Sequence, residues 1–150
     1  MATQLQQISR NLYETDYPQW LEKNVNFLKE GKINLVDYEH LIEELEDLGR
    51  EQRHKVESYL RQLLKHLLLY QYWDSQKLYC ASGWADEIDN FRAELEILLR
   101  SRTLSNYFES IIESTYQRAR KSAIQKSKLT IFPESCPYTI EQILDIDWLP

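Results

Sequence analysis

Glycine and proline are scarce in this chain of 150 residues, which contains three glycines and four prolines. This scarcity excludes a collagen, a disordered linker and a turn-rich all-β domain. Valine occurs only 3 times, against 22 leucines and 12 isoleucines, so most of the aliphatic side chains are of kinds that helices accept. The length suits one domain with a sizeable core. We therefore expect a single all-α domain.

Cysteine is also scarce, and a long apolar run is missing. Cys80 and Cys136 lie far apart without a CxxC motif, which predicts two reduced thiols rather than a disulfide or a metal knuckle. The first residues lack the basic segment and apolar core of a secretory signal. The leucine-rich stretch 63–70 is interrupted by Lys65 and His66 and is too short to cross a bilayer. We expect a cytoplasmic protein without membrane contact.

Basic residues are outnumbered, with 18 Lys and Arg against 24 Asp and Glu and a formal net charge of -6. Nucleic-acid affinity depends largely on cations that replace condensed counterions. The charge balance therefore makes nucleic acid an unlikely partner unless a basic patch is strongly local.

Apolar residues recur at helical spacing along most of the chain. They predict helices from Thr15 or Asp16 to Gly31, and over 37–48, 50–73, 84–100 and 103–126, with residues 1–12 frayed and 74–83 as a connection. Whether the helices flanking Gly49 are continuous is left open. In the tail, 129–150, prolines favour an extended path, and Thr139 with Gln142 forms a capping box for a last short helix. We expect one bundle of about five main helices over 1–150, with the tail packed on it.

Three segments, in this order along the chain, resemble the bacterial "domain of unknown function 29" family, which is frequent in cyanobacteria. They are LYETDYPQWLEKN, DYEHLIEELEDLGREQRHKVESYLRQLLKHLL and FPESCPYTIEQIL. The resemblance extends from about Leu12 to the end and implies an all-helical bundle. It implies no catalytic or binding residue.

The most unusual local feature is an acidic block between Gly31 and Arg50. Its leucine stripe, made by Leu41, Ile42, Leu45 and Leu48, is expected to pack inward. His40, Glu44 and Asp47 follow one another at helical spacing beside that stripe, which would allow a histidine and a carboxylate to bind one divalent metal. A plain solvated acidic face is the competing interpretation.

His66 is the second histidine of interest. It lies beside the apolar stripe of the helix predicted over 50–73, where it could meet Glu44 or His40 if that helix packs against the acidic one. Such a contact would suit metal binding or general acid–base chemistry, and a hydrogen-bonded structural histidine is the alternative. Di-metal bundles need two Glu-x-x-His repeats. Only one is present, at Glu51 and His54, on a charged face.

A basic run follows in the helix predicted over 103–126 and just beyond it. Arg118, Arg120, Lys121, Lys126 and Lys128 occur with no acidic residue between Glu113 and Glu134. This run could contact phosphate, but docking onto the acidic helix predicted over 37–48, of this chain or of a neighbour, fits the overall negative charge better.

Sequence motifs of common enzyme classes are missing, including GxGxxG, the Walker loop and GxSxG. The leading hypothesis is therefore a non-enzymatic module that binds a protein partner or a second copy of itself, with no cofactor expected. One alternative is a metal-dependent or acid–base enzyme that uses Glu44 and His66, assisted by His40 and Asp47. A weaker alternative is nucleic-acid contact through the basic run.

Overall fold

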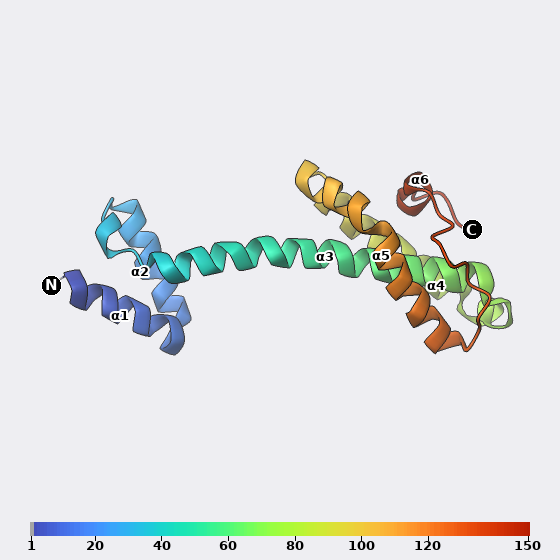
Figure 1. The fold of residues 1–150 in the computed structure, drawn as a ribbon, viewed down its shortest axis with the longest axis horizontal. Helices are drawn as coiled ribbons and strands as arrows, with labels where there is room; N and C mark the ends of the chain where they lie inside the picture. Colours follow the sequence, from blue (N-terminus) through green and yellow to red (C-terminus); the bar gives the residue numbers. More distant parts are fainter. Residues whose placement is uncertain (1) are drawn as a thin grey trace. The chain divides into compact units, whose positions relative to one another are not determined.

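The computed structural model describes residues 2–150, with side chains from Gln4 onward, and confirms the all-α prediction. Figure 1 shows helices and connecting segments only, without a strand among the described residues. The elements are α1 (Ala2–Thr15), α2 (Tyr17–Lys29), a 3-10 segment η1 (Ile33–Leu35), α3 (Tyr38–Tyr72), α4 (Asp74–Leu98), α5 (Arg102–Ser127) and α6 (Ile140–Leu144).

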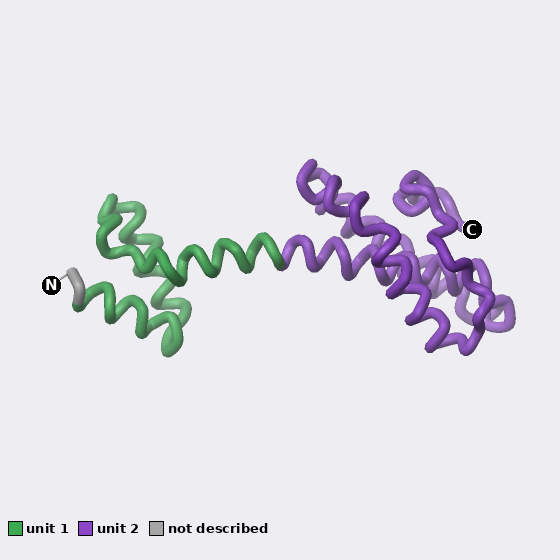
Figure 2. The backbone as a smooth tube through the Cα atoms, in the orientation of Figure 1, with its two compact units in different colours: residues 1–50 green, residues 51–150 purple. Residues whose placement is uncertain are grey.

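The chain forms two compact units, which are residues 1–50 (unit 1) and residues 51–150 (unit 2) (Figure 2). Unit 1 contains α1, α2, η1 and the first turns of α3. Unit 2 contains the rest of α3, α4, α5 and α6. A single domain over 1–150 stays a prediction.

The N-terminal segment differs from the expectation that residues 1–12 fray, because α1 extends over Ala2–Thr15. Leu5, Ile8 and Leu12 do repeat at helical intervals of three and four, although most side chains of this helix are polar. Its buried anchor is polar: Ser9 is inaccessible, and its hydroxyl accepts a hydrogen bond of 3.0 Å from the amide of Asn24 in α2.

The start and end of α2 follow the signals in the sequence. The Asp16 carboxylate accepts a hydrogen bond of 3.2 Å from the backbone N–H of Gln19, and Pro18 occupies the first turn, where no intrahelical donor is needed. At the other end, Gly31 adopts a φ of 71°, which lets the Lys32 N–H bond to the Phe27 carbonyl at 2.8 Å. The predicted cap and stop are confirmed.

The two helices predicted on either side of Gly49 are one continuous helix, α3. The connection predicted over 74–83 is wrong, because α4 already begins at Asp74 and only Trp73 separates it from α3. Gly83 therefore lies inside a helix, where a glycine costs about 1 kcal/mol relative to alanine. Burial of the neighbouring Trp84, which stacks on Trp73 at 5.8 Å, offsets this cost.

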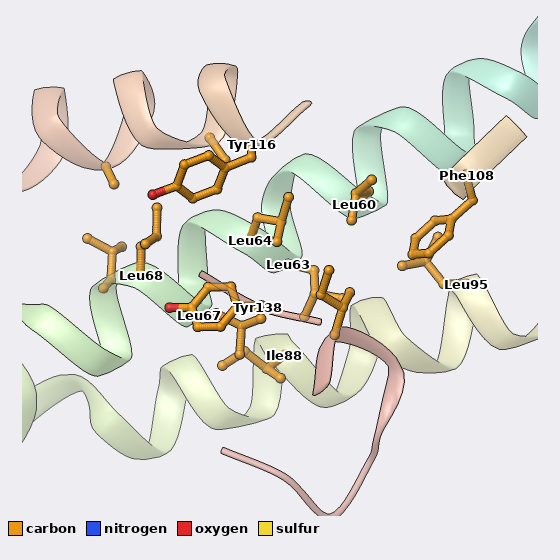
Figure 3. Packing of buried hydrophobic residues seen from close by; sticks show 14 of the residues in the cluster. Leu60, Leu63, Leu64, Leu67, Leu68, Ile88, Leu95, Phe108, Tyr116 and Tyr138 are labelled. Carbon is orange, nitrogen blue, oxygen red and sulfur yellow. The ribbon is translucent and has the colours of Figure 1, made fainter. Parts of the chain in front are cut away.

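Unit 2 has a continuous apolar core centred on the second part of α3. Figure 3 shows the leucines of α3 between Tyr116 of α5 and Ile88 of α4. The buried members of this cluster are Val56, Leu60, Leu63, Leu64, Leu67, Leu68, Leu69, Trp84, Ile88, Leu95, Leu104, Phe108, Tyr116, Ala119, Ala123, Phe132, Tyr138 and Ile143. The apolar stripe of the helix predicted over 50–73 is thus the centre of this core.

The C-terminal tail contributes Phe132, Tyr138 and Ile143 to the core of unit 2. Thr139 and Gln142 form the expected capping box, with both reciprocal hydrogen bonds present at the start of α6. No helix in the part of the chain that the structure describes has the length and apolar character needed to span a membrane.

Candidate functional site

The candidate residues of the acidic block lie in unit 1, on the first turns of α3. Asp37 precedes this helix and caps it, since its Oδ1 lies 3.5 Å from the backbone nitrogen of His40. The side chain of Asp37 is completely inaccessible to solvent. A carboxylate is therefore buried at the N-terminal end of α3, where the helix dipole favours a negative charge.

The Asp37 carboxylate organises the interior of unit 1. Its Oδ2 accepts a hydrogen bond of 3.0 Å from the indole Nε1 of Trp20 in α2. The backbone N–H of Asp37 donates to the Asn24 side chain at 2.8 Å, and the Arg10 guanidinium lies 3.9 Å from Oδ1. Residues from α1, α2 and α3 thus meet at one buried anion.

His40 completes this cluster. Its Nδ1 lies 2.7 Å from Oδ2 of Asp37, and it acts as the donor because an ionised carboxylate only accepts. The Tyr13 ring stacks on the imidazole at 4.0 Å with an interplanar angle of 13°. The His40 side chain remains 21% exposed. An aspartate that orients a partly accessible histidine is an arrangement suited to acid–base chemistry.

The charge of Asp37 is stabilised despite its burial. Burial acts to raise the pKa of Asp37, but the hydrogen bonds from the His40 imidazole and the Trp20 indole outweigh it and lower this pKa below its ordinary value. The carboxylate is therefore ionised at neutral pH and provides the acceptors that Trp20 and His40 require.

Glu44, one turn after His40, is held by two tyrosines. Its Oε1 accepts from the Tyr13 hydroxyl at 2.5 Å, and its Oε2 accepts from the Tyr17 hydroxyl at 2.8 Å. These hydrogen bonds to the carboxylate raise the pKa of both tyrosines. Glu44 thus contacts α1 through the Tyr13 hydroxyl and α2 through the Tyr17 hydroxyl.

Asp47 does not join His40 and Glu44. Its carboxylate forms an exposed ion pair with Arg50, and this hydrogen bond raises the pKa of the guanidinium. Exposed pairs of this kind contribute little to stability.

His66 belongs to unit 2, whereas Glu44 and His40 belong to unit 1. The His66 Nδ1 lies 2.7 Å from the Gln62 carbonyl, and its ring is 5.5 Å from that of Phe91. Burial lowers the pKa of His66. Each contact that the structure gives His66 is within its own unit.

No group of three or more His, Cys, Asp or Glu side chains has the geometry of a metal site among residues 2–150. The four candidate ligands are instead distributed over an Asp37–His40 pair, a Glu44–tyrosine cluster, an Asp47–Arg50 pair and a separate His66. A divalent metal at these residues stays a prediction that would require rearrangement of these contacts.

The leucine stripe of α3 has the opposite orientation to the one expected. Leu45 and Leu48 are 59% and 58% exposed, and Ile42 is 53% exposed, although the stripe was expected to pack inward. The reason is that α3 turns the face bearing Asp37, His40 and Glu44 toward α1 and α2, where these residues find their partners. The polar face is thus internal and the apolar face is at the surface.

The same inversion recurs in α2 and α1. In α2, Asn24 is buried while Leu21, Val25 and Leu28 are exposed; in α1, Ser9 is buried while Leu5 and Ile8 are exposed. In unit 1, Trp20 and Val36 are the buried apolar side chains of the described residues, beside buried Ser9, Asn24 and Asp37. The interior of unit 1 is therefore largely polar.

Exposed apolar side chains are concentrated in unit 1 as a result. Of the eighteen large apolar or aromatic side chains that lie exposed among the described residues, eleven belong to this unit. They are Leu5, Ile8, Tyr17, Leu21, Val25, Leu28, Ile33, Tyr38, Ile42, Leu45 and Leu48. Grouped apolar exposure of this kind marks interaction surfaces in soluble proteins.

The basic run of α5 is partly engaged within unit 2. Arg118 forms an ion pair of 2.6 Å with Glu57 of α3, and the Arg120 Nε donates to the Phe132 carbonyl at 3.2 Å. These two arginines therefore hold α5 to α3 and to the tail. Docking of the basic run onto the acidic helix predicted over 37–48 stays a prediction.

The sequence indicated His40 and Glu44 but missed their partners. Asp37, Tyr13 and Tyr17 belong to no motif that would single them out. A signal exists in the spacing of Tyr13, Tyr17 and Trp20, which repeat at intervals of four and three. It was hidden because α1 and α2 break between Thr15 and Tyr17, so the spacing does not describe one helical face.

Comparison with known proteins identifies a family. The family model described as "Domain of unknown function DUF29" matches residues 12–149. No curated protein and no solved structure matches the chain.

Proposed function

This chain belongs to the DUF29 family, and we propose that it is a protein-interaction module whose contact surface is the apolar face of unit 1. The observation that carries this proposal is the outward orientation of Ile42, Leu45 and Leu48 on a helix whose polar face is internal. A partner that covers this face would remove these side chains from water.

Burial of these leucines against a partner is energetically favourable. Full burial of one leucine side chain contributes about 1.5–3 kcal/mol relative to full exposure. Leu45 and Leu48 are more than half exposed, because the side chains of α3 that contact the rest of unit 1 are the polar ones, such as His40 and Glu44. A surface of this kind is costly to expose and favours association.

Enzymatic chemistry at Glu44 and His66 has less support. Both carboxylate oxygens of Glu44 accept hydrogen bonds from tyrosines, and His66 lies in the other unit. The Asp37–His40 pair is the arrangement in this chain that best suits acid–base chemistry. It also has a full structural role as helix cap and as acceptor for Trp20, which favours the interaction module.

Nucleic-acid contact through the basic run is the weaker alternative. Two of its arginines already bind Glu57 and the Phe132 carbonyl. Fewer cations are then available to replace counterions on a phosphate backbone.

The proposal is tested by native mass spectrometry of the chain isolated gently from its native cells. We expect an assembly heavier than one chain, which the double substitution Leu45→Ser/Leu48→Ser abolishes. The matched control is Leu78→Ser/Tyr79→Ser, which changes two exposed apolar residues of unit 2 and should leave the assembly intact. A bare monomer in the wild type, or an assembly that the Leu45/Leu48 variant retains, would contradict the proposal.

A further inference from the structure

We infer that the partner of this surface is an amphipathic helix with an apolar face flanked by Lys or Arg, contributed by another protein. This inference rests on the proposed function and specifies the chemistry of the partner. The docking stripe is defined as Tyr38, Leu41, Ile42, Leu45 and Leu48.

The docking stripe has the shape of a helix-binding surface. At about 100° per residue, its five side chains fall within an arc of about 120° on α3. Its members Leu41, Leu45 and Leu48 repeat at intervals of four and three, which is the spacing by which two helices pack side by side. Four of the five members are exposed, with Leu41 half-buried. A partner helix can therefore lie along about three turns of α3.

The charge around the docking stripe has one sign. Between Asp37 and Leu48, the ionisable side chains are aspartates and glutamates, together with the His40 imidazole and the Tyr38 phenol. The segment contains no lysine or arginine. Glu39, Glu43 and Glu46 are exposed, and Glu39 and Glu46 border the stripe on one side, with Glu44 on the other. Flanking charges on a helix choose the partner by complementarity. Because Glu44 is already bound by two tyrosines, the complement of this border is Lys or Arg on the edge of the incoming helix that faces Glu39 and Glu46.

A second copy of this chain fits the docking stripe less well. If the stripes of two copies were superposed in parallel, each glutamate would face the same glutamate of the partner. In the antiparallel direction, acidic residues of the same segment would again face one another, because the segment has no lysine or arginine. Like charges placed opposite each other oppose association. The basic α5 of a second copy also fits less well, because its apolar face is buried in the core of unit 2. The basic helix of another protein is therefore the favoured occupant.

The test uses the full chain and three fluorescent synthetic peptides of equal length. The first is helical, with a leucine face flanked by Lys and Arg. The second has the same leucine face with Glu at every basic position, and the third is a scrambled form of the first without an apolar face. Affinities are measured by fluorescence anisotropy at low and at high salt, and circular dichroism verifies that each protein variant retains its helices.

We expect the basic amphipathic peptide to bind at least about tenfold more tightly than the other two, and salt to weaken it. Leu45→Ser/Leu48→Ser should reduce its affinity about a hundredfold, since each buried leucine contributes a factor of about ten. Glu39→Gln/Glu46→Gln should reduce both the affinity and its salt dependence. Leu78→Ser/Tyr79→Ser, the control, should bind as the wild type does.

The remaining outcomes overturn the inference in distinguishable ways. Equal binding of the scrambled peptide would mean unspecific attraction to an acidic surface. Equal binding of the Glu peptide would remove the charge argument while retaining apolar docking. If no peptide binds and the chain dimerises through Leu45 and Leu48, the partner is a second copy, and the proposed function survives. If no peptide binds and no assembly depends on these leucines, the proposed function fails as well.

Discussion

Replacement of Arg92 by methionine is expected to detach the C-terminal tail from α4 and to lower the free energy of unfolding of unit 2 by about 4 kcal/mol. Arg92 is only 2% exposed. Its guanidinium donates to the carbonyls of Gln142 at 2.9 Å, Ile143 at 2.8 Å and Trp148 at 2.8 Å. Two of these carbonyls belong to the last turns of α6, whose acceptors lack intrahelical partners.

Methionine keeps the length and apolar stem of Arg92 but removes all its donors, so three carbonyls lose their partner. Each such group costs about 1–3 kcal/mol if it stays buried. The loss is reduced because burial also disfavours the arginine charge, as its lowered pKa indicates. Urea unfolding measures the change, and the fluorescence of half-buried Trp148 reports on the tail.

The control for Arg92 is Arg100→Met, which changes an exposed arginine just after the end of α4. Its effect is expected to stay within about 0.5 kcal/mol. A loss below about 1 kcal/mol for Arg92→Met, with unchanged Trp148 fluorescence, would mean that the tail is held by its apolar contacts alone.

The second large effect is expected for Asp37→Asn, which should open unit 1 while unit 2 stays folded. An asparagine has one acceptor and one donor group where the carboxylate has two acceptors. The Trp20 indole and the His40 imidazole both bond to Oδ2 of Asp37. The amide oxygen can take the place of Oδ2, but the NH2 group then stands where Oδ1 faces the His40 backbone N–H and the Arg10 guanidinium. The loss of a buried, hydrogen-bonded charge costs about 3 kcal/mol.

Hydrogen exchange followed by mass spectrometry locates this effect. Amides of α2 and of the first turns of α3 should lose protection in Asp37→Asn, while those of the α3–α4–α5 core should not. Asp47→Asn, which changes an exposed carboxylate of the same helix, is the matched control. Uniform loss of protection in both units would contradict an effect confined to unit 1.

The same residue gives a pH dependence of defined sign. The pKa of Asp37 is lower in the folded chain than in the unfolded one. Its contribution is therefore fully present above the unfolded value of about 4, and it is lost as the pH falls through the folded value. Protection of α2 should decline in this acidic range in the wild type, and the Asp37→Asn variant should lack that dependence.

Much of the fold follows from local signals in the sequence. Apolar periodicity locates α2, α3 and α5, and the caps at Asp16 and Thr139 are where side-chain chemistry places them. The errors occur at glycines and polar stretches. Gly83 is read as part of a connection, yet Trp84 and Ile88 pack well enough to keep it helical. Tertiary contacts thus override the local preference.

The orientation of α3 in unit 1 could not be predicted from the same signals. The amphipathic pattern predicts that Leu45 and Leu48 share a face of the helix. It does not predict that this face lies at the surface. The orientation of α3 depends on hydrogen bonds to Asp37 and Glu44. Their donors are Trp20, Tyr13 and Tyr17, which belong to other helices. Arg92 shows the reverse case, because it stands between Ile88 and Leu95 at core spacing, and a buried arginine is rarely expected there.

The exposure of the docking stripe is tested most directly by thiol labelling of the purified chain at low concentration. In a background with Cys80→Ala and Cys136→Ala, single substitutions Leu45→Cys, Leu48→Cys, Leu78→Cys and Leu67→Cys are treated with a polar thiol reagent. Leu78 is 86% exposed and Leu67 is fully buried, so these two positions calibrate the rates. We expect Leu45→Cys and Leu48→Cys to react nearly as fast as Leu78→Cys, and the basic amphipathic peptide to slow only the first two. Rates as low as that of Leu67→Cys would place the stripe inside the protein and contradict its role as a docking surface.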